Sequence, residues 1–270
     1  MTTSPQPASI APGDLAGLPQ PSPQLPMNEW DTSASPSPSP SVSPSRVASP
    51  ASPSPVAPAS PSPSPVVPPA AVGYLPPQET ASADPSNYGD RYATDIYGNP
   101  VNQDWLIVLH ETVGTADSAI QTFQTPHPNE DDQVSYHTII RRDGTIVYIV
   151  PPEKRAYGAG NSVFVSANGV ETVHTDPKYP PSVNNFSYHI SLETPPDGHN
   201  DNLSHGGYTQ QQYDSLAWLI ARTTVPDDRI TTHRAIDQSG SRIDPRSFDP
   251  QQFLARLHLY PHRSAVSSQG

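Results

Sequence analysis

The 270-residue chain contains no cysteine, which excludes disulfide bonds, cysteine metal ligands and cysteine nucleophiles. Basic residues are also scarce: 14 Lys and Arg stand against 26 Asp and Glu, giving a formal net charge of −12. Proteins that bind nucleic acid gather Lys and Arg on one face, so this balance disfavours that class. The chain has no run of about 18 apolar residues, so no segment is expected to span a membrane. Its first residues, MTTSPQPASIAPGDL, lack the basic and apolar regions of a secretion signal.

Proline is abundant and unevenly placed, with 20 of the 37 prolines in the first 70 positions. Residues 33–69 are almost wholly Ser, Pro, Ala and Val, a composition that cannot bury enough apolar surface to fold. Proline also favours an extended, semi-stiff polyproline II conformation. We therefore expect residues 1–86 to be a disordered leader and linker, 87–260 one folded domain, and 261–270 a disordered tail. The leader is either a tether that extends the domain's reach or an inert tail.

Strand and helix patterns alternate after residue 104. The apolar run WLIVL predicts a strand buried on both faces, and Asp143-Gly144 predicts a hairpin turn between two further strands. Apolar residues at helical spacing follow Thr209, which is a suitable cap. This order predicts an α/β fold with a mixed central sheet and flanking helices. The expected strands are 105–109, 134–141, 145–150, 188–192 and 230–232, and the expected helices are 118–123 (with Ser118 as a cap), 209–220 and 251–259.

Two histidines stand at the ends of predicted strands: His110 closes WLIVLH and His233 closes ITTH. Ligands gather at such strand ends in α/β sheets. Asp244 follows His233 across a short loop and could complete a set of two imidazoles and one carboxylate. This set leaves a zinc coordination position open, as in catalytic rather than structural sites. The alternative is that these are two polar strand ends and a turn aspartate.

The region from Trp105 to Phe248 resembles the N-acetylmuramoyl-L-alanine amidase type 2 family, which includes peptidoglycan recognition proteins and amidase-type phage lysozymes. Similar pieces occur in the family's order, which makes the resemblance specific. They are IVLHET, VSYHTIIRRDGTIVYIVPPEKRAYGAG, NNFSYHISLET, YTQQQYDSLAWL and ITTHRAIDQSGSRIDPRSF. Cyanobacterial members, which also carry Pro/Ser-rich leaders, are the most similar in pattern.

The resemblance implies one zinc ion bound by His110, His233 and Asp244. Arg242 occupies a position where many relatives have a lysine that steadies an oxyanion. Arginine keeps the charge but is not an equivalent replacement. Laying the family's SIGIEL strand on HISLET puts its catalytic glutamate on Glu193, whereas phage lysozymes carry a tyrosine at Tyr136. Which of these two assists proton transfer stays open.

Other residues receive supporting roles. His137 and His189 are interpreted as structural. Tyr157, Gly158 and Gly160 resemble a loop that lines the substrate groove, and Ser191 should share a strand face with Glu193.

The resemblance implies zinc-dependent hydrolysis of the amide bond between N-acetylmuramic acid and L-alanine in peptidoglycan. Two alternatives remain: a non-catalytic peptidoglycan-binding module, and an amidase that acts on soluble anhydro-muropeptides during wall recycling. The expected partner is peptidoglycan or a muropeptide, not nucleic acid. We expect a monomer in the cell envelope, a location inferred from the function alone.

Overall fold

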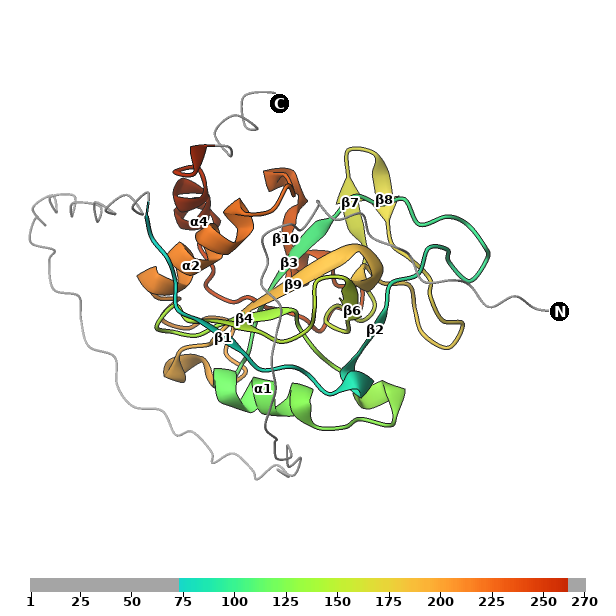
Figure 1. Cartoon of the computed structure of the whole chain (residues 1–270), viewed down its shortest axis with the longest axis horizontal. Coiled ribbons are helices and arrows are strands. Elements are labelled where there is room, and N and C mark those ends of the chain that lie inside the picture. The colour runs from blue at the N-terminus through green and yellow to red at the C-terminus, as the bar shows by residue number, and fades with distance from the viewer. Residues whose placement is uncertain (1–72, 262–270) are drawn as a thin grey trace, which may run out of the picture. The chain divides into compact units, whose positions relative to one another are not determined.

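A computed structural model describes residues 73–261 of the chain. Most of the predicted leader and nearly all of the predicted tail lie outside these residues. The described part is built on a six-stranded sheet with the strand order β1-β5-β4-β9-β3-β10 (Figure 1). The strands are β1 Gln78–Thr80, β5 Ile146–Tyr148, β4 Thr138–Ile140, β9 Ser187–Leu192, β3 Leu106–Glu111 and β10 Ile230–Thr232.

Only the β4–β5 pair is antiparallel within this sheet, and the other neighbours run parallel. The predicted turn at Asp143-Gly144 joins β4 and β5, where Gly144 takes a φ of 89°. Every residue of β3 is buried, as its continuous apolar run predicts. The predicted α/β class with a mixed central sheet is confirmed.

Helices cover both faces of the sheet (Figure 1). On one face, α2 (Gln210–Ala221) and α4 (Pro250–Leu257) pack on the larger apolar cluster, which includes Ile107, Leu109 and Leu216. On the other face, α1 (Ala116–Gln124) packs against Ile139 and Val147. Because successive strand residues point to opposite faces, Leu106 and Val108 of β3 face away from α2 and α4, and they pack in a third apolar cluster with Phe164 and Phe186.

Short elements complete the domain. Two small antiparallel sheets pair β2 (Tyr88–Asp90) with β6 (Lys154–Ala156) and β7 (Phe164–Ser166) with β8 (Gly169–Glu171). A four-residue helix, α3 (His233–Ile236), directly follows β10. The 3-10 helices are η1 Pro85–Asn87, η2 Glu130–Asp132, η3 Asn184–Phe186, η4 Pro196–Gly198 and η5 Asp227–Arg229.

The helix starts show which residues act as caps. Thr209 caps α2, and its side chain and that of Gln212 form a reciprocal capping box. Thr115, rather than the expected Ser118, caps α1, since its hydroxyl accepts a hydrogen bond from the Ser118 N–H at 3.1 Å. The helix therefore begins earlier than the apolar spacing indicated.

The ordered domain begins before residue 87, because β1 pairs with β5 at the edge of the main sheet. Tyr74 also contacts α2 through a 2.8 Å hydrogen bond between its hydroxyl and Ser215 Oγ. The sequence Gln-Glu-Thr of β1 has no apolar pattern, so its pairing depends on backbone hydrogen bonds that composition cannot reveal.

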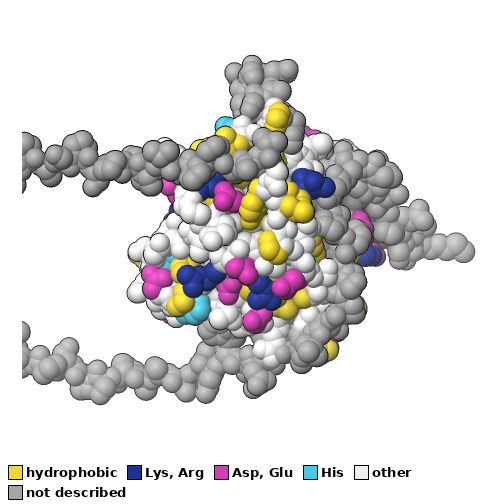
Figure 2. Space-filling model, turned by 60° about the vertical axis from the view of Figure 1, so that its left-hand side comes forward, with side chains coloured by type: hydrophobic (Ala, Val, Ile, Leu, Met, Phe, Trp, Pro, Cys, Tyr) yellow, Lys and Arg dark blue, Asp and Glu magenta, His cyan; other side chains and the backbone are white. Residues whose placement is uncertain are grey.

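Basic and acidic side chains are interspersed, with apolar side chains between them, on the face of the molecule shown in Figure 2. Surface ion pairs occur among the described residues, such as Lys154 with Asp90 at 2.6 Å. No helix among residues 73–261 is long and apolar enough to cross a bilayer.

Candidate metal centre

The three predicted ligands converge where β3 and β10 end. The two strands are parallel neighbours, with Thr232 opposite Leu109, so His110 and His233 follow at the same edge. Asp244 is held beside them because its carbonyl accepts a hydrogen bond from the Arg234 N–H at 2.9 Å. All three side chains are buried, and their potential ligand atoms lie within 4.8 Å of one another.

The carboxylate lies between the two imidazoles. Asp244 Oδ2 is 3.3 Å from Nδ1 of His110, and Asp244 Oδ1 is 3.0 Å from Nδ1 of His233. Nδ1 of His110 is buried and makes no hydrogen bond within residues 73–261. An unpartnered buried nitrogen directed at a carboxylate and a second imidazole fits a metal ligand.

Electrostatics favour the protonation states that a metal ion requires. Burial lowers the pKa of His110 to about 4, so its imidazole is neutral at pH 7. Burial opposes ionisation of Asp244, but the neighbouring side chains of His110 and His233 hold its pKa well below the usual range. Neutral imidazoles and an ionised carboxylate are the forms that bind zinc, so the residues present fit this ion.

Two of the three predicted assisting residues lie close to this cluster. The Tyr136 ring stacks on the His110 ring at 4.3 Å with 25° between the planes. Burial raises the pKa of Tyr136, which keeps its hydroxyl protonated. Burial lowers the pKa of His110, and the positive charge of the exposed Arg242 lowers it further. The backbone N–H of Arg242 donates to Asp237 Oδ2 at 3.1 Å.

The third assisting residue, Glu193, has both carboxylate oxygens engaged by backbone groups. Oε1 accepts from the N–H of Ala116, the first residue of α1, at 3.0 Å, and Oε2 accepts from the N–H of Arg142 at 2.9 Å. A carboxylate at a helix N-terminus stabilises the helix. These contacts support a structural role and give no support to the predicted role in proton transfer.

The β9 residue opposite His110 is Ser191. Its hydroxyl is buried and has no hydrogen-bond partner within residues 73–261. His189, interpreted from the sequence as structural, contacts the cluster directly, with its Nδ1 3.0 Å from Nε2 of His110. Polar residues alternate with apolar ones along this buried strand, so Ser187, His189 and Ser191 share one face. This pattern is the sequence signal that points to His189 and Ser191.

A buried ion pair supports two of the ligand segments. Glu111 follows His110, and it pairs with Arg246, which follows Asp244 by two positions. Arg246 also donates to the carbonyls of Gly198, Asn200 and Asn202, and so fixes the loop before α2. This pair links the end of β3 to the Asp244 loop.

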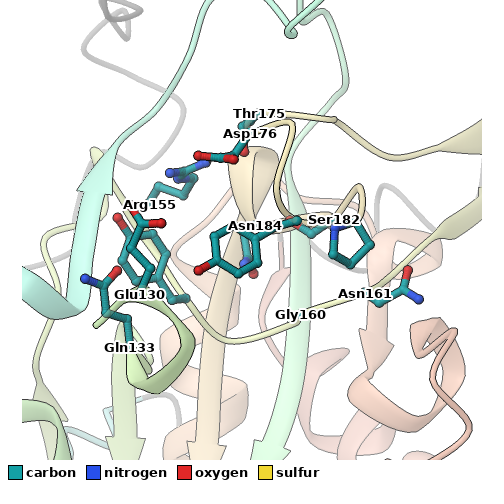
Figure 3. Close-up of a pocket in the computed structure, with 12 residues that line it drawn as sticks. Glu130, Gln133, Arg155, Gly160, Asn161, Thr175, Asp176, Ser182 and Asn184 are labelled. Atoms are coloured by element: carbon teal, nitrogen blue, oxygen red, sulfur yellow. The ribbon is translucent and has the colours of Figure 1, made fainter. Parts of the chain in front are cut away.

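One predicted groove residue, Gly158, packs against His189, the histidine that contacts His110. A Cβ on Gly158 would stand 2.9 Å from the His189 ring, so only glycine fits there. Tyr157 and Gly160 line a cavity of about 210 Å³ next to this point (Figure 3). Arg155 also lines the cavity, and its guanidinium lies over the rings of Tyr92 and Tyr157 at 4.8 and 5.3 Å. The other lining residues are Glu130, Gln133, Asn161, Thr175, Asp176, Tyr179, Pro180, Ser182 and Asn184.

Two imidazoles and one carboxylate at a sheet edge match the donor set of hydrolytic zinc centres. The family model described as N-acetylmuramoyl-L-alanine amidase matches residues 99–247, which include all three candidate ligands. This match covers more than half of the chain. The chain therefore belongs to the N-acetylmuramoyl-L-alanine amidase family.

Individual relatives agree with this assignment. The 1,6-anhydro-N-acetylmuramyl-L-alanine amidase AmpD of Salmonella typhimurium is 35% identical over 135 residues, which are 48% of this chain. AmpD of Citrobacter freundii is 34% identical over the same length. The match spans 61% of the length of these relatives. A solved structure of a selenomethionine AmpD derivative is 26% identical with a TM-score of 0.45, covering 68% of this chain and 97% of that chain.

Proposed function

We propose that this chain is a zinc-dependent amidase that hydrolyses the bond between N-acetylmuramic acid and the L-alanine of a peptidoglycan stem peptide. The observation that carries the proposal is the buried cluster of His110, His233 and Asp244 within the family region. Zinc bound at this centre would polarise the scissile carbonyl and make water nucleophilic near neutral pH. His110, His233 and Asp244 would hold the ion.

We propose that Arg242 and Tyr136 act on the substrate. Attack on the amide carbonyl develops negative charge on its oxygen, and the exposed guanidinium of Arg242 can donate hydrogen bonds to that oxygen. The Tyr136 hydroxyl, which stays protonated because desolvation raises its pKa, can donate a hydrogen bond toward the reacting amide. Glu193 is less suited to this step, since backbone N–H groups engage both of its oxygens.

The cavity lined by Tyr157 and Gly160 is proposed to hold the part of the substrate next to the scissile bond. None of the three candidate ligands lines this cavity. Its lining residue Asn161 connects it to the segment between His233 and Asp244, because the Asn161 carbonyl accepts a hydrogen bond from the Gln238 N–H at 3.0 Å. The lining is polar and carries both signs of charge, as Figure 3 shows for Arg155, Glu130 and Asp176. Such a lining suits a peptide that bears both amino and carboxyl groups.

Mass spectrometry of digests of purified sacculi tests the proposal. Zinc-loaded protein should release free stem peptides that begin at L-alanine, and His110→Ala should release none and lose its zinc. Undiminished zinc binding by His110→Ala would contradict the ligand assignment. A zinc-loaded chain that binds sacculi without releasing peptides would instead be a binding module.

A second candidate substrate is the soluble anhydro-muropeptide. The observation that favours it is the similarity to the AmpD proteins, at 35% and 34% identity, which are 1,6-anhydro-N-acetylmuramyl-L-alanine amidases. Parallel rate measurements on sacculi and on soluble anhydro-muropeptides separate the two substrates. The predicted location in the cell envelope requires activity on sacculi, and cleavage of soluble fragments alone would contradict it.

A further inference from the structure

We infer that His189 is a positioning residue, which fixes the orientation and the tautomer of His110 through a hydrogen bond between the two imidazoles. The inference rests on the proposed metal centre. It concerns the binding of zinc, so it can be tested apart from the hydrolysis reaction.

The contact joins two adjacent parallel strands, β3 and β9 (Figure 1). His189 lies opposite Val108, two positions before Ser191, which is opposite His110. Nδ1 of His189 therefore approaches Nε2 of His110 at 3.0 Å across the strand pair. Both side chains are fully buried, so water does not compete for the bond.

The geometry determines the tautomers once His110 binds a metal ion through Nδ1. That nitrogen must then carry no proton, so the proton of the neutral ring is on Nε2. Nε2–H of His110 donates, and Nδ1 of His189 accepts. His189 in turn carries its proton on Nε2, which has no hydrogen-bond partner within residues 73–261. The bond to His110 is thus the polar contact that the His189 ring makes.

Packing on both sides keeps the His189 ring in place. On one side it stacks on His137 at 5.7 Å with 8° between the planes, and the backbone N–H of His189 donates to Nδ1 of His137 at 2.9 Å. His137 is itself anchored, because its Nε2 donates to the Lys154 carbonyl at 3.1 Å. On the other side, Gly158 lies so close that a Cβ would stand 2.9 Å from the ring.

This arrangement differs from simple core filling. A histidine that only fills space could be replaced by any side chain of similar size, and the burial of two imidazoles would then be unfavourable. A ligand imidazole is held more firmly, and made more basic, when its second nitrogen donates to a fixed acceptor. His189 supplies that acceptor from a neighbouring strand.

A matched pair of variants separates the two roles. His189→Asn keeps an oxygen acceptor near the position of Nδ1, whereas His189→Leu has nearly the same shape and no acceptor. Both variants leave the same small cavity, so their folding stabilities should fall by similar amounts. Zinc affinity, measured by competition with a chromogenic chelator, should fall about 10- to 100-fold in His189→Leu and recover in His189→Asn.

Equal zinc affinities for the Asn and Leu variants would overturn the inference. If either variant fails to fold, the wild-type protein still provides a test by ¹⁵N NMR of its imidazoles with zinc bound. The expected result is a proton on Nε2 of both His110 and His189, and a proton on Nδ1 of His189 would contradict the inference. Wild-type protein that binds zinc as expected but releases no stem peptides would refute the proposed function and leave this inference intact.

Discussion

Residues from four separate segments converge on the imidazole of His110. Asp244 approaches its Nδ1, His189 contacts its Nε2, Tyr136 stacks on its ring, and the ring of His233 lies edge-on at 4.7 Å. The residue is fully buried, so each contact acts in a medium of low dielectric. A substitution at any of these four neighbours should therefore change the affinity of the site for the metal ion.

Removing the charge of Arg242 should slow the reaction without affecting the fold. The side chain is exposed, so Arg242→Met should keep the wild-type free energy of unfolding and zinc content. Loss of an oxyanion donor lowers kcat by roughly 100- to 1,000-fold. Arg242→Lys, which keeps the charge but not the fork of donors, should retain an intermediate rate. Steady-state kinetics on a soluble muropeptide would show it, and a wild-type kcat for Arg242→Met would refute the role.

Glu193 should matter for stability rather than for catalysis. Glu193→Gln keeps one acceptor but loses the charge at the start of α1, which should cost about 1 kcal/mol of unfolding free energy. The rate per folded molecule should stay near that of the wild type. Urea unfolding and activity assays give both values, with the exposed Asp228→Asn as a charge-matched control. A large loss of kcat at unchanged stability would restore the catalytic prediction.

At the scale of elements, the site depends on how β2, β6 and η3 are joined beside the main sheet. Arg91 is buried and donates to the carbonyls of Pro152, Asn184, Asn185 and Ser187. No carboxylate lies within ion-pair distance of it among residues 73–261. Its charge is stabilised by these carbonyl oxygens and by the face of the Trp105 ring, which lies 4.5 Å from the guanidinium. These bonds connect Arg91, which directly follows β2, to the start of β9, the strand that carries His189.

Replacing Arg91 should destabilise this region strongly. Arg91→Met leaves several buried carbonyls without donors, and each such loss costs about 1–3 kcal/mol. We expect a loss of at least about 3 kcal/mol in urea unfolding. The exposed Arg142→Met serves as the control and should change stability little. A similar, small effect of both substitutions would show that the carbonyl network contributes little.

The β7–β8 hairpin is anchored by a partly buried ion pair. Both oxygens of Glu171 accept from the guanidinium of Arg229, at 2.9 and 2.7 Å. The hydrogen bond from Arg229 lowers the pKa of Glu171 below its usual value. The ionised form is therefore bound more tightly in the folded state than in the unfolded state.

The sign of this shift predicts how the pair responds to acid. Its contribution is fully present above the unfolded-state pKa of about 4.3 and is lost as pH falls through the lower folded-state value. The unfolding free energy of the wild type should exceed that of Glu171→Gln by about 1 kcal/mol at pH 7, and this difference should shrink below about pH 4. Unfolding free energies measured from pH 7 to pH 3 test this, and a difference independent of pH would contradict it.

At the scale of the whole molecule, every candidate site residue lies within residues 73–261. A chain shortened to these residues should cleave soluble muropeptides at the full-length rate, provided that circular dichroism shows it folded. If the leader is a tether, only the rate on intact sacculi should fall on truncation. Equal rates of both chains on both substrates would indicate that the leader is inert for catalysis.

The sequence alone was sufficient for the features that depend on local pattern. The continuous apolar run of β3, the hairpin at Asp143-Gly144 and the cap at Thr209 follow from strand burial, turn chemistry and hydrogen-bonding capacity. The strand-end positions of His110 and His233 also indicated a metal centre, because parallel strand ends meet at one sheet edge. Sequence resemblance supplied the family.

Tertiary structure decided the contacts between segments that are distant in sequence. A two-position shift of β9 would put Glu193 opposite His110, and only the strand register shows that Ser191 is opposite it. The backbone partners of Glu193 come from α1 and from the β4–β5 turn, far from it in the chain. The contact between His189 and His110 likewise spans 79 positions and requires β9 to lie against β3. The chain thus encodes which residues are suited to bind a metal ion, while the packing of strands decides which neighbours orient them.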